Sequence, residues 1–265
     1  MTTRRSSLLI AALLAIPAGA HAQLDYRNLD DDRPTLIEDA YPVERYAFEI
    51  LAAWRHSRTH GTGGVHSFVS EIEYGLLGNF HLGLKLPIAR AETLDGHEWG
   101  IAGLRVFGLY NFNTESHWLP ALALRVDASV PVGSLAGEGT RFTAKAIATR
   151  SWGPSRIHLN GAYTFGSNRP LAAADAAHKW WIGGAVDRTL YRQSMLLIAE
   201  VYALRPATSE PVELNASLGM RYQWTPLMVL DLGIARRLRR TGPNYEITMG
   251  ISRAFALAGL LPGRP

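Results

Sequence analysis

Charged side chains recur at every second position in several stretches of the chain, and they are the residues whose types and spacing could do chemistry. Glu71 with Glu73, and Arg125 with Asp127, are two such pairs. Residues at alternate positions of a strand share one face. Carboxylates and guanidiniums on one face can pair across a sheet, bind a charged ligand or line an aqueous path. The pattern therefore predicts a charged surface rather than a single reactive group.

Histidine and serine offer a second possible chemistry. The nearest approaches to a catalytic set are His66-Ser67 and the run from His158 to Gly161. A hydrolase that uses serine and histidine needs a nucleophile, a base and a group that orients the base. Neither of these two sequence motifs supplies all three. We predict no catalytic residues. The alternative is an enzyme acting on lipids, which replacement of Ser67 or His158 would inactivate.

Metal ligands and cofactor motifs are also weakly represented. His56, His60 and His66 surround one expected loop, but no carboxylate accompanies them at a metal-ligand spacing. The glycines at 61–64 and 137–139 do not match a phosphate-binding motif that precedes a helix. We therefore expect no metal site and no cofactor.

Composition narrows the class of protein. The 265 residues include no cysteine, which excludes disulfides and thiolate metal sites. Lys and Arg number 27 and Asp and Glu 23, a net charge of +4, to which Arg4 and Arg5 contribute two. The remainder of about +2 is dispersed along the chain and is not the basic excess that nucleic acid binding requires. We expect no nucleic acid partner.

The first 22 residues have the order of an export signal. Arg4 and Arg5 precede an apolar stretch at 8–16, the breaker Pro17 and the small-x-small sequence at 20–22. The apolar stretch is too short to cross a bilayer as a helix, which takes roughly 20 residues. We predict a signal peptide at 1–22, cleaved after export through the general secretion route.

Residues 23–43 are polar, acidic and interrupted by proline, with Asp30, Asp31 and Asp32 at the centre. They follow neither a helical nor a strand period and should be irregular. Two interpretations are open. The segment is either a periplasmic tail or a plug that folds from Asp30 to Pro42 into the interior of a barrel.

From Arg45 onward the dominant pattern is a period of two, typical of strands with one apolar and one polar face. Residues 212–223 are the clearest case, with Leu214, Leu218 and Tyr222 on one face and Arg221 on the other. Twelve such runs occur, an even number as in most bacterial single-chain barrels. The predicted strands are 44–56, 64–75, 79–89, 99–112, 119–131, 141–151, 156–166, 179–188, 194–204, 212–223, 227–236 and 244–255.

The connections between these strands alternate between short and long. Outer-membrane barrels have short periplasmic turns and long external loops. We therefore predict an all-β fold: a closed, antiparallel, up-and-down transmembrane barrel at 44–255, with both termini in the periplasm and a tail at 256–265. Aromatic residues fall at both strand ends, as the girdles of such barrels do. A soluble sandwich or lipocalin-like barrel is the alternative, and it would turn the charged face outward.

The polar face of the predicted barrel lines its lumen, and mixed charge dominates it. A twelve-stranded barrel lies between filled eight-stranded barrels and sixteen-stranded channels, so a narrow conduit is expected. Arginines at 105, 125 and 221 opposite glutamates at 71, 73 and 213 are the predicted constriction. The alternative is that these charges pair with one another and seal the lumen. The predicted lumen-lining residues are Glu49, Glu71, Glu73, Lys85, Arg105, Arg125, Asp127, Glu213, Arg221 and Asp231.

Several short motifs resemble the outer-membrane barrel family named for the MetA pathway of phenol degradation. They are Asp32-Arg33-Pro34 followed by Glu38, Glu49 in the first strand, the run 84–87, and the C-terminal pieces at 216–222, 225–226, 230–233 and 250–252. The chain departs from the family in having ten residues after Phe255 and Arg253 near its end. We expect this departure to alter how the barrel-insertion machinery recognises the C-terminal strand.

The resemblance implies a function that the periodicity does not. It implies a porin-like outer-membrane channel or transporter of a Gram-negative bacterium, through which small hydrophobic or aromatic molecules pass. The expected partners are outer-membrane lipid, a small-molecule solute and the insertion machinery. A sealed structural barrel remains an alternative to the transporter, as does the lipid enzyme.

Overall fold

The computed structural model describes residues 24–58, 64–93, 96–166, 178–190, 194–206, 211–239 and 243–257. All regular structure in these ranges is β-strand, and none of the described residues forms an apolar helix long enough to cross a membrane. The strands are β1 (Ala47–Arg58), β2 (Gly64–Leu77), β3 (Phe80–Thr93), β4 (Gly96–Ile101), β5 (Leu104–Asn113), β6 (Ala121–Val130), β7 (Arg141–Trp152), β8 (Ser155–Gly166), β9 (His178–Leu190), β10 (Met195–Pro206), β11 (Glu213–Thr225), β12 (Met228–Arg237) and β13 (Tyr245–Ala256).

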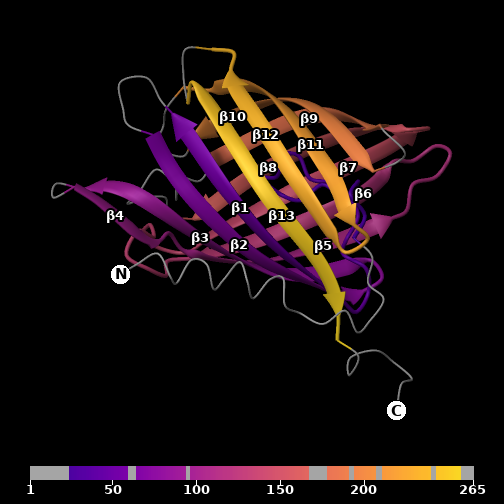
Figure 1. Cartoon of the computed structure of the whole chain (residues 1–265), viewed down its shortest axis with the longest axis horizontal. Helices are drawn as coiled ribbons and strands as arrows, with labels where there is room; N and C mark the ends of the chain where they lie inside the picture. The colour runs from indigo at the N-terminus through magenta and orange to yellow at the C-terminus, as the bar shows by residue number, and fades with distance from the viewer. Residues whose placement is uncertain are drawn as a thin grey trace.

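The strands form one closed antiparallel barrel (Figure 1). Consecutive strands pair, except that β5 pairs with β3 and not with β4, and β1 pairs with β13 from Ala47 opposite Ala256 to Arg58 opposite Tyr245. The ring passes directly from β3 to β5, so it has twelve members, and β4 pairs with the far end of β3. The predicted barrel of twelve strands is confirmed.

One predicted strand, 99–112, is broken. It divides into β4 and β5 at Ala102 and Gly103, opposite Pro87 of β3. Proline has no backbone N–H to give to a ladder, and here the Pro87 carbonyl accepts the Ala102 N–H at 2.9 Å. Gly103 takes a φ of 107°, in the region that glycine adopts without strain. The predicted loop at 90–98 is therefore shorter, because β3 and β4 continue into it as a hairpin.

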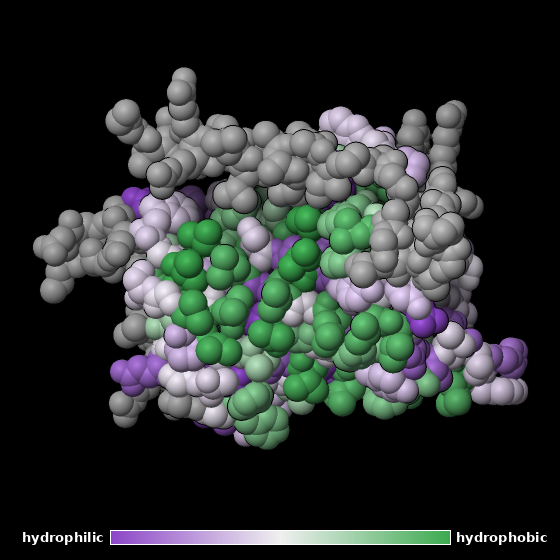
Figure 2. Space-filling model, turned by 90° about the horizontal axis from the view of Figure 1, so that it is seen from below, coloured by the Kyte–Doolittle hydropathy of each residue, from purple (hydrophilic) through white to green (hydrophobic). Residues whose placement is uncertain are grey.

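The barrel buries its polar face and exposes its apolar face. In β6, Leu124 and Val126 are 38% and 46% exposed, whereas Arg125 between them is fully buried. The same inversion holds in β11, where Leu218 is 62% exposed and Arg221 is buried. Figure 2 shows apolar side chains gathered in a band across one side of the barrel. This outer surface is that of a transmembrane barrel. It excludes the soluble alternative, which needs its charged face outward and its apolar face inward.

Short and long connections alternate as predicted, and the aromatic side chains group at the strand ends. Only residues 78–79, 153–154 and 226–227 separate the strands at three of the short turns. At this end of the barrel, which we call the short-turn end, Phe48 lies 4.5 Å from Tyr74 and 5.3 Å from Phe255, between ring centroids. At the opposite, long-loop end, Trp99 and Phe165 are exposed.

Some predictions lie outside the described residues. They are the signal peptide at 1–22, Gln23, His60 in the first long loop, most of the link between β8 and β9, and residues 258–265 of the C-terminal tail.

Candidate functional site

The residues before β1 run inside the barrel, and we call residues 24–46 the N-terminal segment. At the short-turn end, the Leu24 N–H donates to the Pro226 carbonyl at 3.0 Å. The segment then rises into the lumen and returns to β1 at the same end. Its base closes where the Asp39 N–H donates to the Leu29 carbonyl at 3.2 Å, so residues 29–39 form a loop inside the barrel. The segment contacts strands on all sides of the lumen, which places it on the path that a solute would follow.

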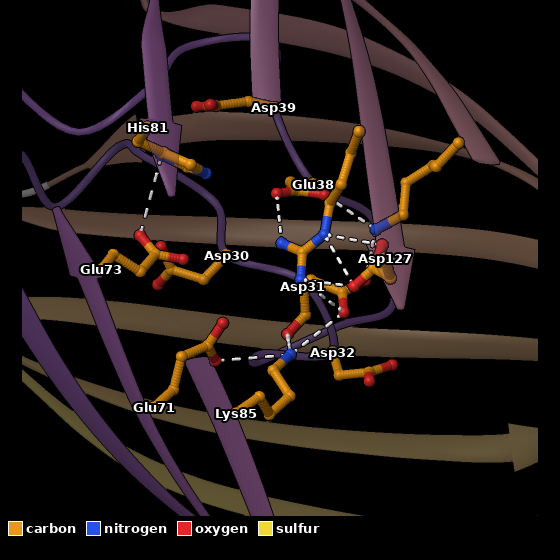
Figure 3. A network of polar contacts seen from close by, with 12 residues as sticks. Asp30, Asp31, Asp32, Glu38, Asp39, Glu71, Glu73, His81, Lys85 and Asp127 are labelled. Carbon is orange, nitrogen blue, oxygen red and sulfur yellow. Dashed lines mark hydrogen bonds and ion pairs between the residues drawn. The ribbon is translucent and has the colours of Figure 1, made fainter. Parts of the chain in front are cut away.

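Asp31, at the tip of this loop, is the centre of a buried charge network (Figure 3). Its carboxylate accepts a hydrogen bond from Lys85 Nζ at 3.0 Å and another from Lys145 Nζ. Guanidinium nitrogens of Arg105 and Arg125 each lie 3.6 Å from it. One acidic residue of the segment therefore meets four basic residues from β3, β5, β6 and β7.

Glu38, on the returning arm of the loop, shares two of these basic residues. Its carboxylate lies 2.8 Å from Arg125 Nη1 and 2.7 Å from Lys145 Nζ. Arg125 also bonds Asp127 of its own strand at 3.0 Å and stacks over the Phe107 ring, 3.6 Å from its centroid. Charged groups that are buried need this kind of multiple pairing to offset their loss of water.

Hydrogen bonds to its backbone hold the rest of the returning arm. The Leu36 N–H donates to Glu200 at 3.0 Å, and the Ala40 N–H donates to Thr149 Oγ1 at 3.1 Å. Asn160 bonds the backbone of Glu38 twice, accepting its N–H and donating to its carbonyl, both at 2.9 Å. Irregular backbone buried in a protein needs such partners for its polar groups, and the lumen wall supplies them.

Burial and neighbouring charges shift the pKa values of Asp31 and Asp39 in opposite directions. Burial raises the pKa of Asp31, but Lys145, Lys85 and the nearby arginines outweigh it and hold that pKa well below its ordinary value. Burial raises the pKa of Asp39 and prevails there, although Arg156 pulls in the opposite direction. The Asp31 anchor is therefore ionised across the whole physiological range of pH.

Two wall glycines make room for the tip. Gly219 of β11 and Gly233 of β12 are paired across the sheet, and both face Pro34. A Cβ at Gly233 would lie 2.0 Å from the Pro34 carbonyl oxygen, and one at Gly219 would lie 2.7 Å from Pro34 Cγ. The barrel wall is thus shaped to receive the segment.

A cavity of about 180 Å³ lies on the long-loop side of the tip. Asp31, Asp32 and Leu36 of the segment form part of its lining. Arg55 and Arg105 on the wall are only about one-third exposed and make long ion pairs of 3.9 Å to Asp32. The lining is completed by polar and apolar groups: Arg33, Ala53, Ser67, Val69, Glu71, Lys85, Pro87, Ala102, Gly103, Leu104, Asp127, Ser129, Arg141, Thr143, Lys145, Thr164, His178, Trp181 and Thr248.

The predicted lumen residues lie on the inner face of the wall, in different settings. Arg105 and Glu213 are only partly buried. Four of the ten belong to the cavity lining: Glu71, Lys85, Arg105 and Asp127. Those that are buried are Glu49, Glu71, Glu73, Lys85, Arg125, Asp127, Arg221 and Asp231.

The predicted constriction is wrong in its partners. Arg125 and Arg221 do not pair with wall glutamates; they bind Glu38 and Asp30 of the N-terminal segment, at 2.8 and 2.7 Å. Glu71 instead pairs with Lys85 of the neighbouring strand at 3.3 Å. The opposing charges come from the N-terminal segment and not from the wall. The acidic run at 30–32 is the signal that pointed to these partners.

His158 belongs to a buried chain of polar groups. Its Nε2 lies 2.9 Å from Asp187 and its Nδ1 lies 3.0 Å from Thr149 Oγ1. This order of carboxylate, imidazole and hydroxyl matches that of a catalytic triad. However, all three side chains are fully buried, none of them lines the cavity, and Thr149 Oγ1 already accepts the Ala40 N–H. The arrangement anchors the N-terminal segment.

The histidines of the first loop region lie in strands where they are described. His56 of β1 is directly opposite His66 of β2, with ring centroids 4.4 Å apart. Trp54 stacks on His56 at 6.0 Å. The two rings thus extend the aromatic girdle of the long-loop end, at the ends of the two strands predicted to flank the first loop.

Comparisons with known proteins agree on the fold. No protein-family model matches the chain, and no curated protein matches it either. Among solved structures, it is similar to the COG4313 outer membrane channel from Pseudomonas putida F1, with a TM-score of 0.61 and 14% identity over 86% of this chain and 100% of that one. The KdgM and NanC porins each give a TM-score of 0.54 and 10% identity over 79% of this chain, and 99% and 100% of theirs. These similarities establish that the chain has the closed barrel fold of outer-membrane proteins.

Proposed function

We propose that this protein is an outer-membrane channel for small molecules, in which the N-terminal segment is the plug. The observation that carries the proposal is the cavity at the long-loop end, whose floor is the tip of the segment. A barrel that served only as a structural element would not need a recess for solute above the loop that the wall glycines accommodate. The similar structures include a channel and two porins, which supports the same class of function.

The cavity lining favours a particular kind of solute. Arg55 and Arg105 offer guanidinium groups to an anion, and Trp181, Leu36 and Leu104 offer an apolar side. A small aromatic carboxylate combines both requirements. The proposal therefore keeps the aromatic solute implied by the family resemblance and adds an acidic group to it. A similar structure, the KdgM porin, is described in complex with oligogalacturonate, which is also acidic.

Transport without catalysis is part of the proposal. His66 and Ser67 are neighbours on β2 and therefore point to opposite faces of the wall. The His158 chain is closed off from the cavity, as described above. Replacement of Ser67 by Ala or of His158 by Gln should leave phospholipid hydrolysis at the background level of the detergent-folded protein. Hydrolysis by the wild-type protein that either change abolished would favour the lipid enzyme instead.

The first experiment is planar-bilayer conductance of residues 23–265, compared with the same protein lacking 24–42. Removing the segment should raise single-channel conductance several-fold, because it empties the centre of the lumen. Benzoate on the long-loop side should block the conductance of the wild-type protein, and Arg105→Gln should weaken that block. The charge-neutral solute benzyl alcohol is the matched control and should block less.

If neither protein conducts, although circular dichroism shows both to be folded, a sealed structural barrel would be favoured. Equal conductance of the two proteins would mean that the segment is not a plug. Equal block by benzoate and benzyl alcohol would mean that the channel does not recognise an acidic group on the solute.

A further inference from the structure

Three buried carboxylates meet near the short-turn end of the lumen, below the charge network of Asp31. They belong to Asp30 of the N-terminal segment, Glu49 of β1 and Glu73 of β2. One oxygen from each lies within 4.8 Å of the other two. Glu49 and Glu73 are directly opposite each other on paired strands, an arrangement that is unfavourable for two like charges without a counterion.

Glu49 lacks the partners that the other buried acids have. It is 3% exposed, and its Oε1 is completely buried without a hydrogen bond from any residue that the structure describes. The ion-pair partner of Glu73 among the described residues is His81 Nδ1, at 3.9 Å. That nitrogen accepts the Val43 N–H at 3.1 Å, so it carries no proton and the ring is neutral. Neither glutamate is therefore neutralised by a basic residue in contact with it.

The basic residues around the cluster are too few. Arg33 and Arg221 both bind Asp30, at 3.1 and 2.7 Å, and Arg33 also lies 3.5 Å from Asp231. Asp30, Glu49, Glu73 and Asp231 thus face two guanidiniums, and four carboxylates against two cations leave two negative charges. The neighbouring network is different, because Asp31, Glu38, Glu71 and Asp127 each lie within 3.3 Å of a lysine or arginine nitrogen.

We propose that Asp30, Glu49 and Glu73 bind one divalent cation, and that calcium is the ion that fits best. The residual charge of the cluster equals that of such an ion. All three ligands are oxygens, which hard cations prefer, and two oxygens on opposite sides of a calcium ion with bonds of ~2.4 Å are about 4.8 Å apart. The shorter bonds of magnesium, about 2.0–2.1 Å, would demand a tighter cluster. Figure 3 shows the carboxylates of Asp30 and Glu73 side by side, with His81 above Glu73.

The site would link the N-terminal segment to the wall. Asp30 comes from the segment, whereas Glu49 and Glu73 come from β1 and β2. A cation shared by the three would hold the loop in the lumen at a point that the Asp31 network does not reach. This role is independent of any solute, so the inference does not rest on the proposed function.

The test is calcium binding by the mature protein, refolded in neutral detergent and freed of metal with EDTA. Calorimetric titration with calcium chloride should show one equivalent bound and a rise in melting temperature. Glu49→Gln and Glu73→Gln should each weaken calcium binding at least tenfold. The control, Glu115→Gln, removes a carboxylate at the same end of the barrel that pairs with Arg150 and lies outside the cluster, so it should bind as the wild type does.

A wild-type protein that binds no calcium at millimolar concentration, with the same melting temperature in calcium and EDTA, would overturn the proposal. Binding retained by both glutamine variants would overturn it equally. Because titration of the wild-type protein needs no variant, the first of these outcomes is decisive even if a variant fails to fold. Greater stability of Glu49→Gln in EDTA, without calcium binding by the wild type, would show that the carboxyls share a proton instead.

Discussion

Arg125 of β6 and Glu38 of the N-terminal segment lie 2.8 Å apart in the middle of the barrel, both buried, and 87 residues separate them in sequence. The contact joins the wall to the segment that fills the lumen. Arg125 bonds Asp127 as well, and Glu38 bonds Lys145, so neither member has a free alternative. Removing either one leaves a buried charge with less compensation than before.

Arg125→Ala should loosen the N-terminal segment. The change removes the contacts to Glu38, Asp127 and Asp31 and the stacking on Phe107. Breaking a buried ion pair from one side costs about 3–5 kcal/mol. We expect a lower melting temperature, higher conductance and a shift of ion selectivity toward cations, measured by reversal potential in a salt gradient.

Arg125→Lys is the matched control for that variant, because it keeps the charge and loses the fork of donors. It should retain the selectivity of the wild type while losing part of the stability. A conducting Arg125→Ala barrel with unchanged selectivity would mean that Arg125 is not on the conducting path.

Gly233→Ala should displace the tip of the segment. Its Cβ would meet the Pro34 carbonyl, a backbone atom that cannot turn away as a flexible side chain can. Overpacking of this kind costs typically 1–3 kcal/mol. Proteolysis of the folded barrel should then cut within 24–46 faster than in the wild type. Gly161→Ala is the control, since the nearest atom to its Cβ is 4.0 Å away; equal cleavage of both variants would contradict the close fit.

The Asp31 anchor should resist mild acid. The folded pKa of Asp31 lies below the ordinary aspartate value of 3.8, so its contribution to stability is fully present above pH ~3.8 and is lost as the pH falls through the lower folded value. Wild-type protein should exceed Asp31→Asn in stability by a constant amount from pH 7 to about pH 4.5, with the difference shrinking below pH 3.8. Urea unfolding in detergent at several pH values measures this, and a difference already vanishing at pH 5 would contradict it.

Leu218→Lys should destabilise the barrel in lipid. Leu218 is exposed on the apolar outer face at mid-strand, opposite Ile234 and Ala199. A lysine facing lipid near the bilayer midplane costs about 2–4 kcal/mol, and one near the interface about 0–1 kcal/mol. Trp118→Lys, at a side chain 85% exposed between β5 and β6, is the interfacial control. Equal losses in urea unfolding from lipid vesicles would contradict the placement of the apolar band.

The sequence by itself determined the class of fold. Alternation of apolar and polar residues is a local property of each strand, so Leu124, Arg125 and Val126 already show which face each side chain takes. Turn length is equally local, and it gave twelve strands in the order the barrel has. The break at Gly103 was not predicted, because the alternation continues across it and the cause, Pro87, lies on another strand.

Only the tertiary structure decided what fills the lumen and which charges meet. Asp30, Asp31 and Glu38 pair with residues from five strands. Asp31 and Lys85 are 54 residues apart in sequence, and Asp30 and Arg221 are 191 residues apart. Alternation says that a charged side chain points inward, but not which partner lies across the lumen, since closure of the ring sets that distance. The cluster of Asp30, Glu49 and Glu73 exists for the same reason, because barrel closure and the path of the N-terminal segment together bring the three carboxylates to one point.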